Sequence, residues 1–269
     1  MNATLFKQMM KMNLRGFLNF AFGSAFYILL MFWLYPGIAT NAGAIDSIVA
    51  SMPEGVGRAF GLNGFGTADA FISGEFYGLI LVLILSIVSV QLATKLMARL
   101  VDQGSMAYLL STPTTRGRIA FTQAAVLTVG LALILGVTTL AGFAGNAWFL
   151  GDEHALNTGR FALLNVAAFL LFFAVGGISF LVSSVAGDEK QALGTAGAIT
   201  FGFYSLDLLG KLSERIEWVR GASLFALYRP ASIANGTADV LGPFVILAAI
   251  GLASFALAIV LFRRRDLSL

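Results

Sequence analysis

Few residues of this chain are of the types that carry out catalysis or bind metals, and their spacing matches no known catalytic or metal-binding motif. The single histidine, His154, follows Asp152 and Glu153 in a short polar stretch, a setting more typical of a solvated loop than of a metal site. With no cysteine in the chain, thiolate catalysis, thiolate metal sites and disulfides are excluded. No HExxH or GxSxG pattern occurs. The sequence therefore predicts no catalytic residue and no metal site.

Nucleotide hydrolysis by a phosphate-binding loop is excluded as well. The closest approach to a Walker A motif, Gly210-Lys211-Leu212, lacks the first glycine and the serine or threonine that follows the lysine. Any ATP-driven work that involves this chain therefore needs an ATPase on another subunit.

The elements that must position the polar residues are long apolar runs. A helix of roughly 20 apolar residues crosses a hydrocarbon core about 30 Å thick. Hydrophobic residues make up 58% of the chain and charged residues 12%, whereas soluble domains contain roughly 25% charged residues. Six runs contain no Asp, Glu, Lys or Arg: Gly16 to Tyr35, Phe76 to Thr94, Ile119 to Leu150, Phe161 to Gly187, Gln191 to Leu206 and Val240 to Phe262. The sequence predicts an all-α, polytopic membrane protein with six transmembrane helices.

We expect a single transmembrane domain over residues 1–269. The runs are continuously apolar and do not alternate, which excludes a β-barrel. The first run is too long for a cleavable signal and lacks an Ala-x-Ala exit, so it is expected to remain in the protein. The predicted spans cover approximately residues 16–35, 76–97, 119–142, 161–185, 191–209 and 240–262.

Basic residues predict the orientation of these spans. Lys and Arg near span ends are retained in the cytoplasm. One side of the six-span arrangement holds both termini and most of the basic residues: Lys7, Lys11, Arg15, Lys95, Arg99, Arg116, Arg118, Lys190, Arg263, Arg264 and Arg265. The other side holds Arg58, Arg160, Lys211, Arg215, Arg220 and Arg229 together with most of the acids. Both termini are therefore expected in the cytoplasm, and the net charge of +3 indicates topology rather than nucleic-acid binding.

The uncharged polar residues of the runs argue against two classes of transporter. Ion-coupled carriers and proton pumps normally place an ionisable residue inside the membrane, and the six runs contain only Asn, Gln, Ser, Thr and Tyr as polar side chains. Glycines within the runs are interpreted as points of close helix packing. These glycines are Gly130, Gly136, Gly142, Gly176 and Gly177.

Two segments predicted to lie in the cytoplasm carry patterned residues. In the first sixteen residues, Lys7, Lys11 and Arg15 are spaced four apart among apolar residues, which predicts an N-terminal interfacial helix with its cations on one face. The second segment, Lys95 to Arg118, contains a possible short helix from Asp102 to Leu110 that ends before Pro113. Each helix is either a membrane anchor or a contact for a cytoplasmic partner.

On the outer side, Gly210 to Leu241 mixes charged and apolar residues as re-entrant amphipathic helices do.

The loop sequence LVDQGSMAYLLSTP, Leu100 to Pro113, is followed by Thr115 and Arg116. It resembles the acidic-x-Gly-x-x-x-x-Leu-Leu-Ser-x-Pro-x-x-Arg loop of type-2 ATP-binding-cassette (ABC) membrane subunits, although many relatives have Glu where this chain has Asp102. The chain end, Phe262-Arg263-Arg264-Arg265-Asp266-Leu267, is similar to the Phe-x-x-Arg-Asp-Leu termination of the same bacterial permeases.

The resemblance implies a coupling helix at about Asp102 to Ser111 that docks into an ABC ATPase subunit, which binds ATP and Mg²⁺. It also implies that the helix with Lys7, Lys11 and Arg15 contacts the ATPase. Two permease copies, identical or related, would form the substrate path mostly from the first, second and fifth spans, and Gly210 to Leu241 would close its exit. The implied coupling residues are Asp102, Gln103, Gly104, Ser105, Met106, Tyr108, Leu109, Ser111, Pro113 and Arg116.

These expectations describe the permease subunit of an ATP-driven exporter in the bacterial inner membrane, with a drug, antimicrobial peptide, lipid or ion as substrate. Its expected partners are the ATPase, a second permease copy and membrane lipid, but no nucleic acid. The alternative is a polytopic membrane protein that works without ATP, either an assembly or immunity factor or a membrane enzyme. An enzyme would be expected to cluster His, Asp, Glu or Arg at one membrane face, whereas here the acids are scattered.

Overall fold

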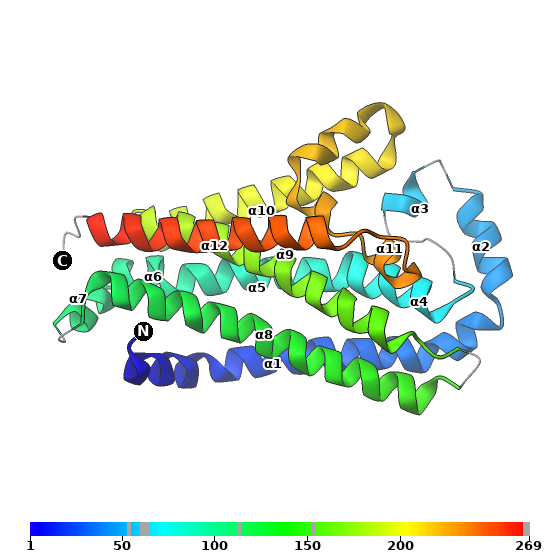
Figure 1. The fold of residues 1–269 in the computed structure, drawn as a ribbon, viewed down its shortest axis with the longest axis horizontal. Coiled ribbons are helices and arrows are strands. Elements are labelled where there is room, and N and C mark those ends of the chain that lie inside the picture. Colours follow the sequence, from blue (N-terminus) through cyan, green and yellow to red (C-terminus); the bar gives the residue numbers. More distant parts are fainter. Residues whose placement is uncertain (53–54, 60–64, 112–113, 152–153, 266–269) are drawn as a thin grey trace.

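The chain folds into a bundle of long helices, seen here in a computed structural model that describes residues 1–52, 55–59, 65–111, 114–151 and 154–265 (Figure 1). Among these residues there is no strand. The α-helices are α1 Ala3–Ala39, α2 Ala42–Ala50, α3 Val56–Ala59, α4 Ala68–Phe71, α5 Leu81–Leu96, α6 Ala98–Asp102, α7 Ser105–Leu110, α8 Arg116–Phe149, α9 Thr158–Val185, α10 Glu189–Leu212, α11 Pro230–Asn235 and α12 Leu241–Arg264. A π-helical segment, η1 Ile72–Ile80, joins α4 to α5, and two 3₁₀ helices, η2 Glu214–Ala222 and η3 Leu224–Leu227, follow α10.

Six of these helical stretches are long and apolar enough to cross a membrane, which confirms the predicted all-α architecture with six candidate spans. They are Ala3–Ala39, Ala68–Asp102, Arg116–Phe149, Thr158–Val185, Glu189–Leu212 and Leu241–Arg264. Both termini lie at one end of the bundle together with α6 and α7, and we call this the terminal end (Figure 1). The opposite end, with α2, α3, α4 and α11, is called the far end.

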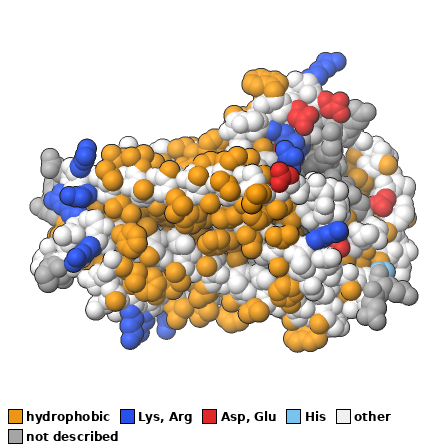
Figure 2. Space-filling view, in the orientation of Figure 1, with side chains coloured by type: hydrophobic (Ala, Val, Ile, Leu, Met, Phe, Trp, Pro, Cys, Tyr) orange, Lys and Arg blue, Asp and Glu red, His pale blue; other side chains and the backbone are white. Residues whose placement is uncertain are grey.

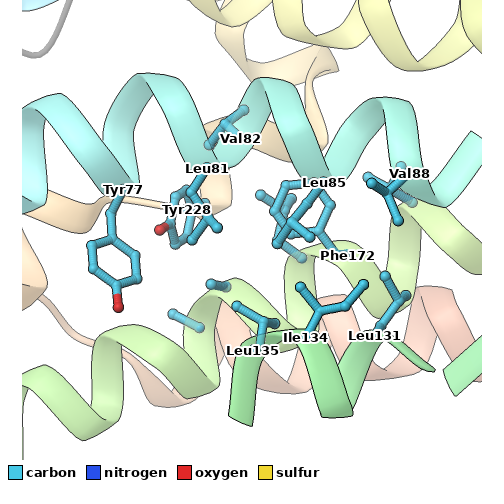
Figure 3. Packing of buried hydrophobic residues seen from close by; sticks show 14 of the residues in the cluster. Tyr77, Leu81, Val82, Leu85, Val88, Leu131, Ile134, Leu135, Phe172 and Tyr228 are labelled. Carbon is cyan, nitrogen blue, oxygen red and sulfur yellow. The ribbon is translucent and has the colours of Figure 1, made fainter. Parts of the chain in front are cut away.

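Helix α9 occupies the middle of the bundle. It contacts α5, α8, α10 and α12, whereas α1 packs chiefly along α8 at one edge. A helix that is apolar around its whole circumference is expected to be buried, and α9 has no charged residue after Arg160. Its Phe172 lies between the second and third candidate spans, near Leu85 of α5 and Ile134 of α8 (Figure 3). The core therefore runs along the length of the bundle.

Close approach between α9 and α12 depends on two glycines. A Cβ atom added at Gly177 would lie 2.9 Å from the backbone oxygen of Gly251, and one added at Gly251 would lie 2.4 Å from the Phe173 ring. Added Cβ atoms at Gly130 and Gly142 would collide with the rings of Phe17 and Phe161 in the same way, at 2.3 Å. The packing role expected from the sequence therefore fits these positions, since only a missing side chain permits such contacts.

Two of the expected packing glycines have looser surroundings. A Cβ atom added at Gly176 would meet the nearest Leu131 carbon at 3.3 Å, and Gly136 has no atom within 4 Å of its added Cβ position. Gly136 is exposed on α8, so it makes no close helix contact within this chain.

The N-terminal segment does not form a separate interfacial helix. Residues from Ala3 onward are the first turns of α1, which continues without interruption to Ala39. No proline precedes Pro36, so nothing in the sequence forces the expected turn into the membrane. A helix of this length is about 55 Å long at about 1.5 Å per residue, longer than a bilayer core of about 30 Å. The turns that carry Lys7, Lys11 and Arg15 therefore extend α1 beyond its apolar span.

The contact between α9 and α12 is testable by substitution. We expect Gly177→Ala to lower the stability of the protein by about 1–3 kcal/mol, the usual cost of overpacking a close contact. Thermal unfolding in lipid nanodiscs, followed by tryptophan fluorescence, measures this loss as a lower midpoint. Gly136→Ala is the matched control, because Gly136 of α8 has no atom within 4 Å of an added Cβ. An equal midpoint for the two variants would contradict the packing assignment.

Candidate functional site

The loop between the second and third candidate spans forms a short helical hairpin at the terminal end. Helix α6 ends at Asp102, Gly104 adopts the left-handed conformation with φ of +69°, and α7 begins at Ser105. A side chain is disfavoured at such a backbone angle, so glycine suits this reversal. The structure thus has a six-residue helix in the region where the sequence predicts one, beginning three residues later at Ser105 rather than at Asp102.

Helix α7 presents a tyrosine outward and a methionine inward. The Tyr108 side chain is 80% exposed, whereas Met106 is fully buried. Leu109 and Leu110 are half-buried against the core. The family resemblance implies Met106 and Leu109 as coupling residues, and in this structure the Met106 side chain is buried within the chain's own bundle. The apolar side of so short a helix is stabilised by burial in its own bundle, which leaves Tyr108 as the large group that it exposes.

The other residues singled out in the loop lie around α7. Asp102, Gln103, Gly104 and Ser111 are exposed. Ser105 and Arg116 are half-buried. The Ser111 hydroxyl donates to the Tyr108 carbonyl at 2.8 Å, which closes the last turn of α7. Pro113 lies outside the described residues.

Asp102 joins this loop to the start of α10. Its carboxylate accepts a hydrogen bond from the Glu189 backbone N–H at 3.2 Å, and the Glu189 carboxylate lies 3.7 Å from the Arg99 guanidinium. Asp188 caps the same helix by accepting from the Gln191 N–H at 2.7 Å. Carboxylates at a helix N-terminus satisfy backbone N–H groups that have no partner within the helix. The loop and α10 are therefore linked directly.

Arg265 makes the corresponding contact at the end of α9. Its guanidinium donates to the carbonyls of Ser184 at 3.0 Å and Ala186 at 2.7 Å, where a cation is favoured by the unpaired carbonyls of a helix C-terminus. The Arg265 carbonyl in turn accepts from the Arg116 guanidinium. The tail arginine thereby connects α8, α9 and α12, while Asp266 and Leu267 of the tail motif lie outside the described residues.

The first turns of α1 lie against the start of α8. The Asn2 N–H donates to the Thr122 hydroxyl at 3.1 Å, and its side-chain amide donates to the Thr114 hydroxyl at 3.0 Å. Lys7, Lys11 and Arg15 are exposed, while Met9 and Asn13 are buried on the opposite side of the helix. The face visible in Figure 2 shows Lys and Arg but no Asp or Glu at the terminal end. On this face the terminal end is therefore cationic, while Asp102, Asp188 and Glu189 lie at the junction between α6 and α10 at the same end.

A buried ion cluster at the far end was missed by the sequence analysis. Asp207 of α10 has a side chain that is 3% exposed, and its oxygens lie 2.6 Å from Lys211 Nζ and 3.0 Å from Arg220 Nε. The Asp207 and Lys211 spacing of four, typical of a helical ion pair, was the only available signal. Arg220 lies in η2, so the cluster fixes η2 to α10.

Ionisable residues do lie within the candidate spans, in contrast to the uncharged runs expected from the sequence. The helices extend past the uncharged runs, so that Asp69 and Glu75 lie in the second candidate span and Asp207 lies in the fifth. Asp207 is paired with Lys211 and Arg220. Its contacts are those of a structural ion cluster.

The family model described as ABC-2 family transporter protein matches residues 4–267. This range includes α7, the start of α10 and Arg265. No curated protein matches the chain.

The far-end cluster gives a prediction about local stability. Asp207→Ala leaves two partly buried cations without their carboxylate, so we expect the free energy of opening η2 to fall by about 1–3 kcal/mol. Trypsin cleavage after the exposed Arg215 measures this opening. In the control Glu217→Ala, an exposed contact of 3.5 Å to Arg220 is lost, which is expected to cost at most about 1 kcal/mol. Equal cleavage rates in both variants would argue against a stabilising role for Asp207.

Proposed function

Because the chain belongs to the ABC-2 family of transporter proteins, whose members are membrane subunits, we propose that it is a permease that exports its substrate at the expense of ATP. In this proposal ATP and Mg²⁺ bind to a separate ABC ATPase subunit. Family membership favours this function over a membrane enzyme or an ATP-independent assembly or immunity factor.

The exposed Tyr108 on α7 is the observation that carries the proposal. A short helix that projects a large aromatic side chain is suited to a groove on a partner protein, and buried tyrosines are frequent energetic centres of interfaces. Asp102, Gln103, Gly104, Ser105 and Ser111 surround it as further contacts. Met106 and Leu109 instead hold α7 against the bundle, and Arg116 supports the end of the loop through Arg265.

The exposed cations of α1 form a second contact in this proposal. Lys7, Lys11 and Arg15 lie on the same terminal end as α7 (Figure 1), so one ATPase can reach both. The ATPase works in the cytoplasm, and the positive charge of this end supports a cytoplasmic location for both termini. The proposed location of the protein is the bacterial inner membrane.

Helix α10 is the proposed contact with a second permease copy, identical or related. Gly194, Gly197 and Gly202 have no atom within 4 Å of an added Cβ, and Leu193 and Leu209 are 44% and 46% exposed. Small residues allow another helix to approach closely in a membrane. The substrate path would then lie between the copies, with η2, η3 and α11 closing it at the far end.

Docking of the ATPase is tested by Tyr108→Ala. We expect ATPase recovered with the permease to fall at least about tenfold, as for loss of an aromatic anchor worth about 2 kcal/mol. Co-purification in mild detergent measures the recovery, and unchanged permease yield shows that membrane insertion is intact. Trp218→Ala is the control, because Trp218 is 79% exposed in η2 at the opposite end. Full recovery of the ATPase with Tyr108→Ala would remove the main support for docking at α7.

The proposed dimer is tested by cross-linking. The natural chain has no cysteine, so Gly194→Cys provides a single reactive position on α10. We expect a disulfide-linked dimer after mild oxidation in native membranes, since small residues permit close helix approach. Gly136→Cys on α8 is the control and should remain monomeric. If both variants cross-link equally or neither does, α10 is not the specific contact.

A further inference from the structure

The second candidate span is broken at Met97, between α5 and α6. Met97 has φ of −127° and ψ of −74°, far from helical values, and its side chain is fully buried. Breaks in helices are usually caused by Pro or Gly, or by a side chain that inserts into the hydrogen-bond ladder. No Pro or Gly occurs between Leu81 and Asp102. Among these causes, Pro and Gly are therefore excluded at this break.

Ser183 of α9 supplies the inserted side chain. In a continuous helix the Ala98 N–H would bond to the Thr94 carbonyl. Here the Ala98 N–H donates to the Ser183 hydroxyl oxygen at 3.1 Å, and that hydroxyl donates to the Ala93 carbonyl at 3.0 Å. Ser183 and Ala98 are each 1% exposed, so no water is available to replace either bond. One hydroxyl thus satisfies backbone groups on both sides of the break.

The segment beyond the break is attached to α9 and α10 rather than being a stiff extension of α5. Asp102 of α6 accepts from the Glu189 N–H at the start of α10, and Arg99 lies 3.7 Å from the Glu189 carboxylate. Arg265 binds the Ser184 carbonyl, one residue after Ser183. These contacts surround the junction between α9 and α10, so a displacement of α6 acts first on that junction.

We propose that Ser183 is a positioning residue of the transport cycle: its hydroxyl keeps the helix broken at Met97, so that α6 and α7 move with α9 and α10. This inference rests on the proposed docking of an ATPase at α7. In an unbroken helix, a displacement of Tyr108 would be transmitted to α5. Because of the break, the displacement is instead transmitted to the central helix α9 and to α10, the helix proposed to contact the second copy.

The connection of α6 and α7 to α9 through the Ser183 hydroxyl can be tested without the ATPase. Spin labels at Tyr108→Cys and Val185→Cys, both exposed positions, report the distance between α7 and the end of α9 in the full chain reconstituted in nanodiscs. We expect one narrow distance distribution in the labelled protein that keeps Ser183. In the same protein with Ser183→Ala, the distribution should be shifted or broadened. Ser183→Thr keeps the hydroxyl and should retain the narrow distribution. An unchanged distribution with Ser183→Ala would overturn the proposal.

A matched control separates the hydroxyl contact from a general loss of packing. Ser184→Ala makes the same substitution one residue along, where the hydroxyl bonds only to the Leu181 carbonyl within its own helix, at 2.7 Å. Its distribution should match that of the unsubstituted protein. If Ser184→Ala broadens the distribution as much as Ser183→Ala does, the bridging role of Ser183 is refuted.

The transport role is tested in the complex with the ATPase. Labels at Lys190→Cys of α10 and Leu257→Cys of α12, both exposed, report the movement of α10 when ATP and vanadate are added. We expect Ser183→Ala to retain ATPase binding and hydrolysis but to lose the nucleotide-driven change in distance. A retained change would refute the positioning role. Failure of any ATPase to bind the unsubstituted protein would instead refute the proposed function and leave the first test of the connection standing.

Discussion

In the hydrocarbon core of a membrane no water can bond to a backbone N–H or C=O, so every such group needs a partner in the protein. This constraint accounts for two places where the chain departs from regular helix. At Met97 the break is possible because the Ser183 hydroxyl bonds to Ala98 and Ala93 on its two sides. At the end of α9 the free carbonyls of Ser184 and Ala186 are taken by Arg265. In both places the backbone groups are satisfied by a side chain from a distant part of the chain.

These side-chain contacts connect different elements at the two ends of the bundle. At the terminal end they converge on the junction between α9 and α10, which Asp102 approaches from α6 and Arg265 from the end of α12. At the far end Asp207 binds η2 to α10 through Arg220. Helix α10 is thus held at both ends by charged contacts while much of its apolar middle is exposed. A helix attached in this way is suited to move between a driving subunit and a second copy of the permease.

Particular residues show how far the sequence could predict the site. The short helix in the loop was expected from its composition and from Pro113, and the structure has it at Ser105–Leu110. Its orientation was not predictable, because Met106 and Tyr108 are both large, and only the packed bundle decides that Met106 is buried. The length of α1 was missed because charge marks where an apolar run ends, whereas a helix continues until a residue or a contact stops it. Asp207 was missed because its second partner, Arg220, lies in a different element.

The sequence by itself determined the six apolar helices, the position of the loop and the family resemblance. These features depend on local properties, since helical hydrogen bonds join residues four apart and a span is recognised by its own composition. The tertiary structure decided the contacts that make the terminal end one unit. Ala98 and Ser183 are separated by 85 residues, and Asp102 and Glu189 by 87. Such pairs leave no periodic signal in a single sequence, because only the packing of α9 and α10 against the second candidate span brings their atoms within bonding distance.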